Sequence, residues 1–369
     1  MNSTGSSESF RPVRIAVVGL NFGRIIVRDL MRTPAYGLQV VMVCDRDREM
    51  ADKVAAEFGV SACYDLDAVL ADPQIEAVGL FTGPHGRADI LRKIIRTGRD
   101  VVTTKPFEVD VEAARSVLDE AATLGRIIHL NSPTPCMPSD IIRMQECVHE
   151  FDLGRPLALR AETWAGYNEK ANGSWYDDPV LCPAAPLLRL GIYFFNDFCP
   201  FMGDPASVHV MATRLRTERP TPDHAHAGIR FHNGALAQVF ASFCVDDGRS
   251  WQDRVSLVYE RGTITRWIER PVAHVHAEAF AVVECLAAGM DRPVRTHMPK
   301  GDYAGQYQWG LFARKVRGLP VVEPAALADP VYGVRLLDAI GRSCQSGREV
   351  MVVADKPESV AVPRAAHAV

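Results

Sequence analysis

The sequence lacks three features that would place it in other classes of protein. No apolar run approaches the roughly 18 residues that a helix needs to cross a bilayer. Neither sign of charge forms a long block, and 41 basic against 45 acidic residues leave a net charge of −4, so nucleic-acid or membrane-surface binding is not indicated. The nine cysteines are scattered without a Cys-x-x-Cys pair, which argues against a zinc site and predicts reduced thiols in a cytoplasmic protein.

The opening residues, MNSTGSSESFRP, also lack the apolar core of a signal peptide. We therefore expect residues 1–12 to form a flexible tail, with a second tail over residues 359–369. The chain as a whole has 369 residues, of which 47% are hydrophobic and 23% charged. This length and composition predict an ordinary globular protein of about two domains.

The first third of the sequence alternates strand and helix signals. Continuous apolar, β-branched runs predict strands buried on both faces, at residues 13–20, 38–45, 75–81, 100–104 and 126–131. Segments with helical periodicity separate these runs. Because strands separated by helices form βαβ units, residues 13–132 are predicted to be a Rossmann-type domain with a parallel sheet and helices on both faces.

After residue 132 the pattern changes. Residues 133–140 contain three prolines, which indicate a domain junction. A helix at 140–151 is then followed by alternating, strand-like segments that the turn signals HNGA and ERGT connect directly. Residues 133–358 are therefore predicted to form an α+β domain with a large, mostly antiparallel open sheet, in a chain that is α/β overall. Its other helices are expected near residues 187–202, 277–289 and 331–346.

The first predicted strand runs into GLNFGR, at residues 19–24. A dinucleotide site needs Gly-x-Gly-x-x-Gly here, because the backbone must turn tightly and approach a pyrophosphate at a helix N-terminus. Gly19 is in place, Asn21 replaces the second glycine, and the third comes one residue early as Gly23. Because Asn tolerates positive φ best among the other residues, we expect the turn to survive and Gly19, Asn21, Phe22 and Gly23 to bind the cofactor. A plain strand-to-helix turn is the alternative.

Asp45 ends the second predicted strand, where an acid can accept hydrogen bonds from the ribose hydroxyls of NAD. Arg46 follows it and would instead favour the 2′-phosphate of NADP. We favour NAD because Asp45 would repel that phosphate, and we count both residues as cofactor-binding. The alternative role of Asp45 is to cap the helix that follows.

The segment TGPHGRADILRKIIRTGRDVVTTKPFEVDVEAA, residues 82–114, resembles the Gfo/Idh/MocA oxidoreductases. In that family a Thr-Pro-x-x-x-His-like loop follows the fourth strand and a Glu-Lys-Pro motif follows the fifth. Further segments that resemble the family follow in the same order: NGSWYDDP, LGIYFFNDFCPFMGDP, FHNGALAQVFASF and LLDAIGRSCQSGREV. The resemblance implies a nicotinamide cofactor, with contacts from Thr82, Pro84, His85, Thr104, Lys105 and Trp175.

Lys105 stands at the carboxyl end of the apolar run VVTT and precedes Pro106. Open α/β sheets bind their ligands at this end of their strands. The resemblance implies that Lys105 is catalytic and lies near the nicotinamide and a substrate oxygen, where an ammonium would stabilise a developing oxyanion. The alternative is an exposed lysine at a strand end.

The helix that carries the family's Asp-x-x-x-His motif departs from the pattern here. In LLRLGIYFF, Arg189 stands at the Asp position and Tyr193 at the His position. Tyr193 is expected to transfer a proton, with a pKa that a cationic Lys105 would lower from about 10. The alternative is an ordinary half-buried aromatic residue.

Arg189 predicts an anionic substrate, because guanidinium binds carboxylate or phosphate bidentately. A salt bridge to Asp197 or Asp178 is the alternative, since a partly buried charge needs a partner. Other residues are expected to line the substrate pocket, namely Trp164, Tyr167, Lys170, Trp175, Tyr176 and Asp197.

Two histidine clusters raise the question of a metal. His224 and His226 alternate on one predicted strand, and His274 and His276 are followed by Glu278. Because neither cluster has an evident third ligand from elsewhere in the chain, we predict no metal site.

These observations predict an NAD-dependent dehydrogenase or reductase, with NADP as the alternative cofactor. Its substrate would be a sugar, sugar acid or related polyhydroxylated small molecule that exchanges hydride at an alcohol or ketone carbon. A catalytically degenerate ligand-binding regulator and an imine or ene reductase are the alternatives. The resemblance also implies a homodimer or homotetramer that packs through the open sheet around residues 206–267.

Overall fold

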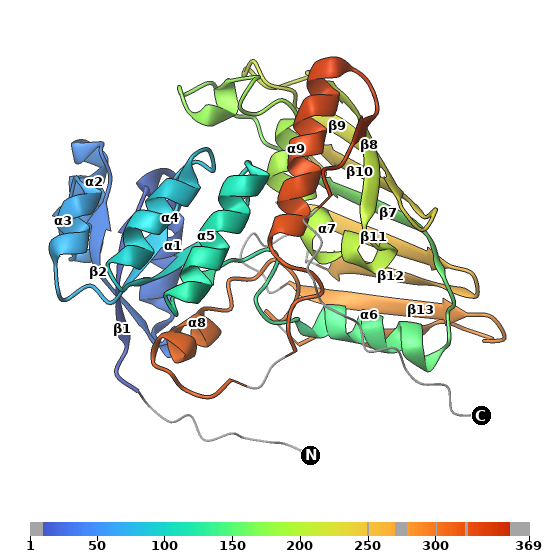
Figure 1. Cartoon of the computed structure of the whole chain (residues 1–369), viewed down its shortest axis with the longest axis horizontal. Coiled ribbons are helices and arrows are strands. Elements are labelled where there is room, and N and C mark those ends of the chain that lie inside the picture. The colour runs from blue at the N-terminus through green and yellow to red at the C-terminus, as the bar shows by residue number, and fades with distance from the viewer. Residues whose placement is uncertain (1–9, 249–250, 270–278, 300, 322–323, 355–369) are drawn as a thin grey trace.

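The computed structural model describes residues 10–248, 251–269, 279–299, 301–321 and 324–354. The chain forms two sheets that lie side by side, one between two layers of helices and one with a helix-covered face and an open face (Figure 1). No helix within these ranges is long and apolar enough to cross a membrane.

The first sheet is parallel and has the strand order β3-β2-β1-β4-β5-β6, as predicted for a Rossmann-type domain. Its strands are β1 (Val13–Val18), β2 (Leu38–Cys44), β3 (Ser61–Cys63), β4 (Ala77–Leu80), β5 (Asp100–Thr103) and β6 (Ile128–His129). The short β3 and the helix after it were not predicted, because each has too few apolar residues to show a period.

Helices cover both faces of this sheet and bury its two apolar surfaces. They are α1 (Leu20–Arg32), α2 (Arg48–Phe58), α3 (Leu66–Ala71), α4 (Arg87–Arg96) and α5 (Val111–Thr123), with a short 3₁₀ turn η1 (Pro34–Tyr36). Two of them begin at an Asp side chain that accepts a hydrogen bond from a backbone N–H in the first turn: Asp47 caps α2 and Asp110 caps α5.

The second sheet has nine strands in the order β14-β13-β12-β11-β7-β10-β9-β8-β15. Neighbouring strands are antiparallel except for β7 and β10, which pair in parallel, so the sheet is mostly antiparallel, as predicted. The strands are β7 (Pro156–Trp164), β8 (Pro205–Thr213), β9 (His224–Phe231), β10 (Leu236–Ser242), β11 (Gln252–Tyr259), β12 (Gly262–Glu269), β13 (Phe280–Ala287), β14 (Val294–His297) and β15 (Val350–Met351).

The helices of the second half are mostly short, and all except α8, which packs against the first domain, lie on one face of this sheet or beside it. They are α6 (Ser139–Glu150), η2 (Trp175–Asp177), the π-helical turn η3 (Leu187–Gly191), α7 (Ile192–Asp197), η4 (Cys199–Met202), α8 (Trp309–Val316) and α9 (Val331–Ser346). The helix predicted near 277–289 is wrong, because the described part of that segment is strand β13, paired on both sides. A short apolar run such as FAVVECLA does not distinguish the helical period from the strand period, and pairing with β12 and β14 makes this segment a strand.

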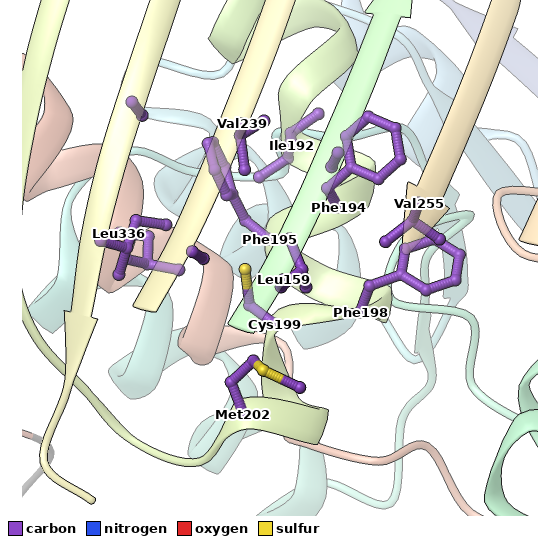
Figure 2. Packing of buried hydrophobic residues seen from close by; sticks show 14 of the residues in the cluster. Leu159, Ile192, Phe194, Phe195, Phe198, Cys199, Met202, Val239, Val255 and Leu336 are labelled. Carbon is purple, nitrogen blue, oxygen red and sulfur yellow. The ribbon is translucent and has the colours of Figure 1, made fainter. Parts of the chain in front are cut away.

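The helix α7 fixes the orientation of the predicted site residue Tyr193. Figure 2 shows Ile192, Phe194 and Phe195 directed into the core, against Leu159 and other side chains of the sheet. Their neighbour Tyr193 remains only partly buried and faces the cleft described below. The apolar positions around it therefore hold this tyrosine in place.

The chain returns to the first sheet after building the second. Trp309, Phe312 and Ala313 of α8 belong to the apolar core of the Rossmann-type domain, although the sequence division placed them in the second domain. Residue Phe10, assigned to the N-terminal tail, also packs against this core. The two domains are thus tied together by more than the proline-rich junction.

Candidate active site

A cleft of about 1180 Å³ lies between the two domains. It opens at the carboxyl ends of β1 and β4, the neighbouring strands at which the strand order reverses and where such sheets bind ligands. Fourteen of the predicted site residues line it: Gly19, Asn21, Phe22, Asp45, Arg46, Thr82, Pro84, Thr104, Lys105, Tyr167, Trp175, Tyr176, Arg189 and Tyr193. Gly23, His85, Trp164 and Asp197 are outside its lining.

The turn after β1 is built by Gly19 alone. Gly19 has φ +86°, and a Cβ there would lie 2.9 Å from the carbonyl carbon of Phe81, so only glycine fits. The expectation that Asn21 preserves the turn through positive φ is wrong, because α1 begins at Leu20 and Asn21 lies in its first turn. The backbone N–H groups of that turn have no acceptor within the helix, which makes this end of α1 suited to an anion.

Gly23 has a packing role. A Cβ at this position would lie 3.0 Å from Cγ1 of Val17 and 3.6 Å from the ring of Phe81. Its absence lets α1 approach the sheet closely, which is the role of the last glycine in a dinucleotide fingerprint. The displaced glycine therefore supports the site without lining it.

Asp45 lies at the end of β2, beside the start of α1. Its Oδ2 accepts a hydrogen bond from the N–H of Leu20 at 2.7 Å, and its Oδ1 accepts from the N–H of Asp47 at 3.0 Å. The alternative that Asp45 caps the following helix is wrong, because Asp47 caps α2. Each carboxylate oxygen has a second lone pair, so Asp45 can also accept from a ribose hydroxyl.

Arg87, the first residue of α4, holds two cofactor loops together and was missed by sequence reasoning. Its side chain is 1% exposed and donates hydrogen bonds to the backbone carbonyls of Thr82, Gly83, Thr104 and Pro106. Burial lowers its pKa to about 10. A cation in the first turn of a helix opposes the helix dipole, and this anomaly was the available signal.

Lys105 follows the carboxyl end of β5 and lines the cleft, where the sequence placed it. Its Nζ donates a hydrogen bond to the backbone carbonyl of Arg189 and lies 4.6 Å from the centre of the Tyr193 ring. Burial, with a smaller contribution from the Arg189 charge, lowers the pKa of Lys105 to about 7. The amine can therefore gain or lose a proton near neutral pH.

Tyr193 behaves differently from the prediction. Burial raises its pKa well above the usual value, whereas a neighbouring ammonium was expected to lower it. Its hydroxyl accepts a hydrogen bond from Nδ2 of Asn131 at 3.3 Å. The phenol is therefore neutral and a weak acid, although Tyr193 is part of the cleft lining.

Asn131 joins these two residues and was not predicted. Its Oδ1 accepts a hydrogen bond from the backbone N–H of Lys105 at 3.0 Å, while its amide donates to Tyr193 and to the carbonyl of Gly305. Asn131 follows β6, one strand beyond Lys105, so its place at the carboxyl edge of the sheet was a usable signal.

Arg189 is held by an acid that the sequence did not identify. Its Nη1 and Nη2 donate to the two carboxylate oxygens of Glu169 at 2.7 and 2.9 Å. Its guanidinium also lies 4.3 Å from the ring centre of Tyr176 and 4.9 Å from that of Tyr167. The proposed partners Asp197 and Asp178 are therefore wrong, and the alternative of a salt bridge holds with Glu169.

The remaining predicted residues have other contacts. Nε1 of Trp164 donates to Asp247, and Lys170 pairs with Glu218 at 3.7 Å. His85 is hydrogen-bonded to the carbonyl of Leu181 and lies edge-on to the Trp175 ring.

Asp197 is 5% exposed and accepts a hydrogen bond from Oγ of Ser132, behind the cleft wall, so the structure does not place it against a substrate. Of the two histidine clusters, His224 is hydrogen-bonded to Ser242, and residues 274–278 lie outside the described residues.

The cleft fits a dinucleotide along the first domain. The glycine turn at Gly19, the first turn of α1 and the carboxylate of Asp45 lie together in its wall, and Arg87 fixes the loops that lead to Lys105. Trp175 closes it from the second domain, since a Cβ on Gly83 would lie 2.9 Å from the Trp175 ring. Lys105 and Tyr193 bring an amine and a phenol together in the cleft lining, with the amine 4.6 Å from the ring centre.

Comparison with protein-family models gives two matches that together span most of the chain. Residues 13–132 match the oxidoreductase family with the NAD-binding Rossmann fold, GFO_IDH_MocA. Residues 141–265 match the GFO/IDH/MocA C-terminal domain.

Among curated relatives, inositol 2-dehydrogenase of Mycolicibacterium smegmatis is 26% identical over 68% of this chain and 71% of the relative. D-glucoside 3-dehydrogenase of Escherichia coli is 21% identical over 94% of this chain and 99% of the relative. Several other matches span less than two thirds of the relative, as little as 28%. Among solved structures, GenD2 from gentamicin A biosynthesis, in complex with NAD, superposes with a TM-score of 0.70 at 21% identity and covers 94% of this chain and 98% of GenD2.

Proposed function

The chain belongs to the GFO/IDH/MocA family of NAD-binding oxidoreductases, and from this premise we propose that it transfers hydride between NAD and an alcohol or ketone carbon of a neutral polyhydroxylated substrate. The observation that carries the proposal is the position of the Lys105 amine in the cleft, 4.6 Å from the centre of the Tyr193 ring, where burial lowers the pKa of the amine to about 7 and keeps the phenol neutral. When bound, the nicotinamide supplies or accepts the hydride.

The adenosine end favours NAD over NADP. Asp45 lines the cleft at the end of β2, and the negative charge of its carboxylate would repel the 2′-phosphate of NADP. Arg46 also lines the cleft and is the residue that would attract the phosphate. Two backbone hydrogen bonds hold the Asp45 carboxylate in place, so the charge that would repel a 2′-phosphate is a fixed part of the cleft wall.

Lys105 is proposed as the acid and base of the reaction. As a neutral amine it takes the proton of a substrate hydroxyl during oxidation, and as an ammonium it returns a proton to the oxygen during reduction. Tyr193 keeps its proton over this pH range, because burial raises its pKa, and its hydroxyl orients the substrate oxygen by hydrogen bonding. This reverses the division of roles expected from the sequence.

A neutral substrate replaces the anionic one that Arg189 predicted. Glu169 accepts hydrogen bonds from both terminal nitrogens of its guanidinium and neutralises its charge, so the end-on bidentate face is not available to a substrate carboxylate. Aromatic side chains line the same region: Tyr167, Trp175, Tyr176, Tyr193, Trp251 and Tyr303. Sugars and cyclitols fit such a wall, and the relatives named for inositol and D-glucoside support this class.

The test begins with fluorescence titrations of the protein with NADH and NADPH. We expect the protein to bind NADH at least 10-fold more tightly than NADPH. Turnover of cyclitols, free sugars and glucosides with NAD is then measured for the parent and for Lys105→Met. Binding of neither cofactor would refute the oxidoreductase function, and NADH binding without turnover of any substrate or matching imine would favour the degenerate ligand-binding protein instead.

We further propose that copies of the chain associate through the open face of the nine-stranded sheet. This face carries exposed apolar side chains that alternate with buried ones, among them Met211, Leu236 and Leu286. Sedimentation should give a dimer or tetramer, and Met211→Glu should shift it toward the monomer. A monomeric parent protein would contradict this proposal.

A further inference from the structure

A charged cluster on the floor of the cleft takes no part in the reaction proposed above. Asp253 and Arg266 line the cleft together with Trp251 and Tyr303. Asp253 comes from β11 and Arg266 from β12, and both lie on the buried face of the sheet. Val255 pairs with Arg266 across the two strands and lies two residues after Asp253 on the same face of β11. A cluster of charges in this position needs a physical reason, because burying charge is costly.

One guanidinium is held between two carboxyl groups. Nη1 of Arg266 donates to Oδ2 of Asp253 at 2.7 Å, and its Nε donates to Oδ2 of Asp140 at 2.9 Å. Asp140, from α6, also accepts from the backbone N–H of Ala304 at 3.0 Å. The relative exposures are 0% for Arg266, 0% for Asp140 and 6% for Asp253.

Asp253 is the member of the cluster that stability does not explain. Asp140 alone would give Arg266 a one-to-one partner, so Asp253 adds a second buried carboxylate to a pair that is already complete. Its Oδ1 is buried and has no hydrogen-bond partner within the described chain. An unsatisfied carboxylate oxygen beside a ligand cleft is an acceptor without a donor.

The same loop connects this cluster to the reaction centre. Ala304 is bonded to Asp140, and Gly305 lies against Tyr193, so closely that a Cβ on Gly305 would be 3.0 Å from the Tyr193 ring. Asn131 also donates to the carbonyl of Gly305. The loop of Ala304 and Gly305 therefore fixes the position of the charged cluster relative to Lys105 and Tyr193, the two points that a substrate would contact.

We propose that Asp253 is a specificity-determining residue whose Oδ1 accepts a hydrogen bond from a donor group of the substrate, a hydroxyl or an amine. This group sits on a carbon other than the one that exchanges hydride. This assignment rests on the proposed function and extends it, because it adds a second contact point for the substrate. Arg266 and Asp140 are the positioning residues that hold Asp253 at the floor.

The test uses the full chain saturated with NADH, a complex in which an alcohol binds without reacting. Quenching of NADH fluorescence is titrated with myo-inositol, D-glucose and methyl α-D-glucoside, and with the monodeoxy and amino-deoxy form of each. For the parent ligand that binds, we expect one of its deoxy forms to bind at least about 10-fold more weakly than the parent ligand itself. Asp253→Asn should reduce that ratio to less than 3-fold, because an amide is a weaker acceptor than a carboxylate.

Two comparisons decide the outcome. Arg254→Gln changes the adjacent residue on the exposed face of the same strand, and it should keep the parent's ratio. One amino-deoxy form could bind more tightly than the corresponding hydroxyl form and lose this difference in affinity in Asp253→Asn. That result would identify the donor group as an amine. An Asp253→Asn variant with the parent's ratio would overturn the proposal.

A measurement without substrate separates this inference from the proposed function. If none of the ligands binds the NADH complex, the polyol proposal fails, and the melting temperature then decides the role of Asp253. We expect Asp253→Asn to melt at the parent's temperature or above, since Arg266 keeps Asp140. A loss of more than a few degrees would show that Asp253 is a structural charge and would overturn the assignment.

Discussion

The amine of Lys105 lies 4.6 Å from the ring centre of Tyr193, and the same burial acts on their two pKa values in opposite directions. It lowers the pKa of the lysine to about 7 and raises that of the tyrosine, because in each case it disfavours the charged form. The phenol is therefore uncharged near neutral pH, whereas the lysine is present in both its neutral and its charged form. Of the two groups, only the lysine changes its protonation state near neutral pH.

Replacing Lys105 by Met should abolish most of the activity and leave cofactor binding nearly intact. Removing a positioned acid or base typically costs about 10²- to 10⁴-fold in rate. We expect kcat to fall within that range and the Kd for NADH to change less than 3-fold, measured by steady-state kinetics and fluorescence titration. Lys53→Met, an exposed position on α2, is the matched control and should retain parent activity. Full activity in Lys105→Met would exclude Lys105 from the chemistry.

The two directions of the reaction should show opposite pH dependence. Oxidation needs the free amine of Lys105, so its rate should rise as pH increases through about 7, and reduction needs the ammonium, so its rate should fall over the same interval. Initial rates in both directions between pH 5.5 and 9 check this. Profiles without a turn in this interval, as an unperturbed lysine or tyrosine with a pKa of about 10 would give, would contradict the assignment.

Breaking the Arg189–Glu169 pair should change both stability and ligand preference. Glu169→Gln leaves the guanidinium of Arg189 among aromatic rings without a full counter-charge. Because Glu169 is partly exposed, we expect a loss of about 1–2 kcal/mol in the free energy of unfolding, below the cost for a fully buried pair. The freed guanidinium should also bind sugar acids more tightly than the parent does. Weaker binding of acids by the variant than by the parent would argue against this account.

Asp197 should act on stability alone. Burial raises the pKa of its carboxyl to about 7, so the folded state binds a proton that the unfolded state releases near pH 4. This contribution is present at low pH and is lost as pH rises from about 4 to about 7. Asn keeps a neutral side chain at every pH, so Asp197→Asn avoids the cost of ionising the buried carboxyl, and we expect the variant to be more stable than the parent by about 1 kcal/mol or more at pH 8 and by little at pH 4, in urea titrations.

NADH affinity of Asp197→Asn should remain unchanged, because the side chain lies outside the cleft lining. A variant that is less stable than the parent at pH 8 would show that the carboxylate form is needed.

Gly23→Ala should loosen the cofactor end of the first domain. The new Cβ would lie 3.0 Å from Val17 and push α1 away from the sheet. We expect a loss of about 1–3 kcal/mol in the free energy of unfolding and weaker NADH binding. Gly310→Ala in α8 meets no atom within 4 Å and should leave stability equal or slightly higher. Equal stability of both variants would show that helix–sheet contact at Gly23 is not limiting.

Sequence reasoning recovered the strands and residues that have a local signature. Buried β-branched runs give the parallel sheet, and Lys105 follows one of them directly, so its place at the sheet edge could be predicted. Arg87 and Asn131 were missed because their partners are backbone atoms of other loops, which leave no mark on residue spacing. Glu169 was missed because it lies in a loop 20 residues before Arg189, with no periodic relation to it. The direction of the Tyr193 pKa shift depends on burial, which emerges only when the two domains meet.

The return of α8 to the first domain has a consequence for how the protein can be divided. Cutting the chain at residue 132 would separate the Rossmann-type sheet from Trp309, Phe312 and Ala313, which complete its core. The fragment would keep its glycine turn yet expose the apolar patch that α8 covers, and such patches promote aggregation. Swapping nucleotide-binding modules among relatives therefore requires two splice points, with this helix transferred along with the strands it covers.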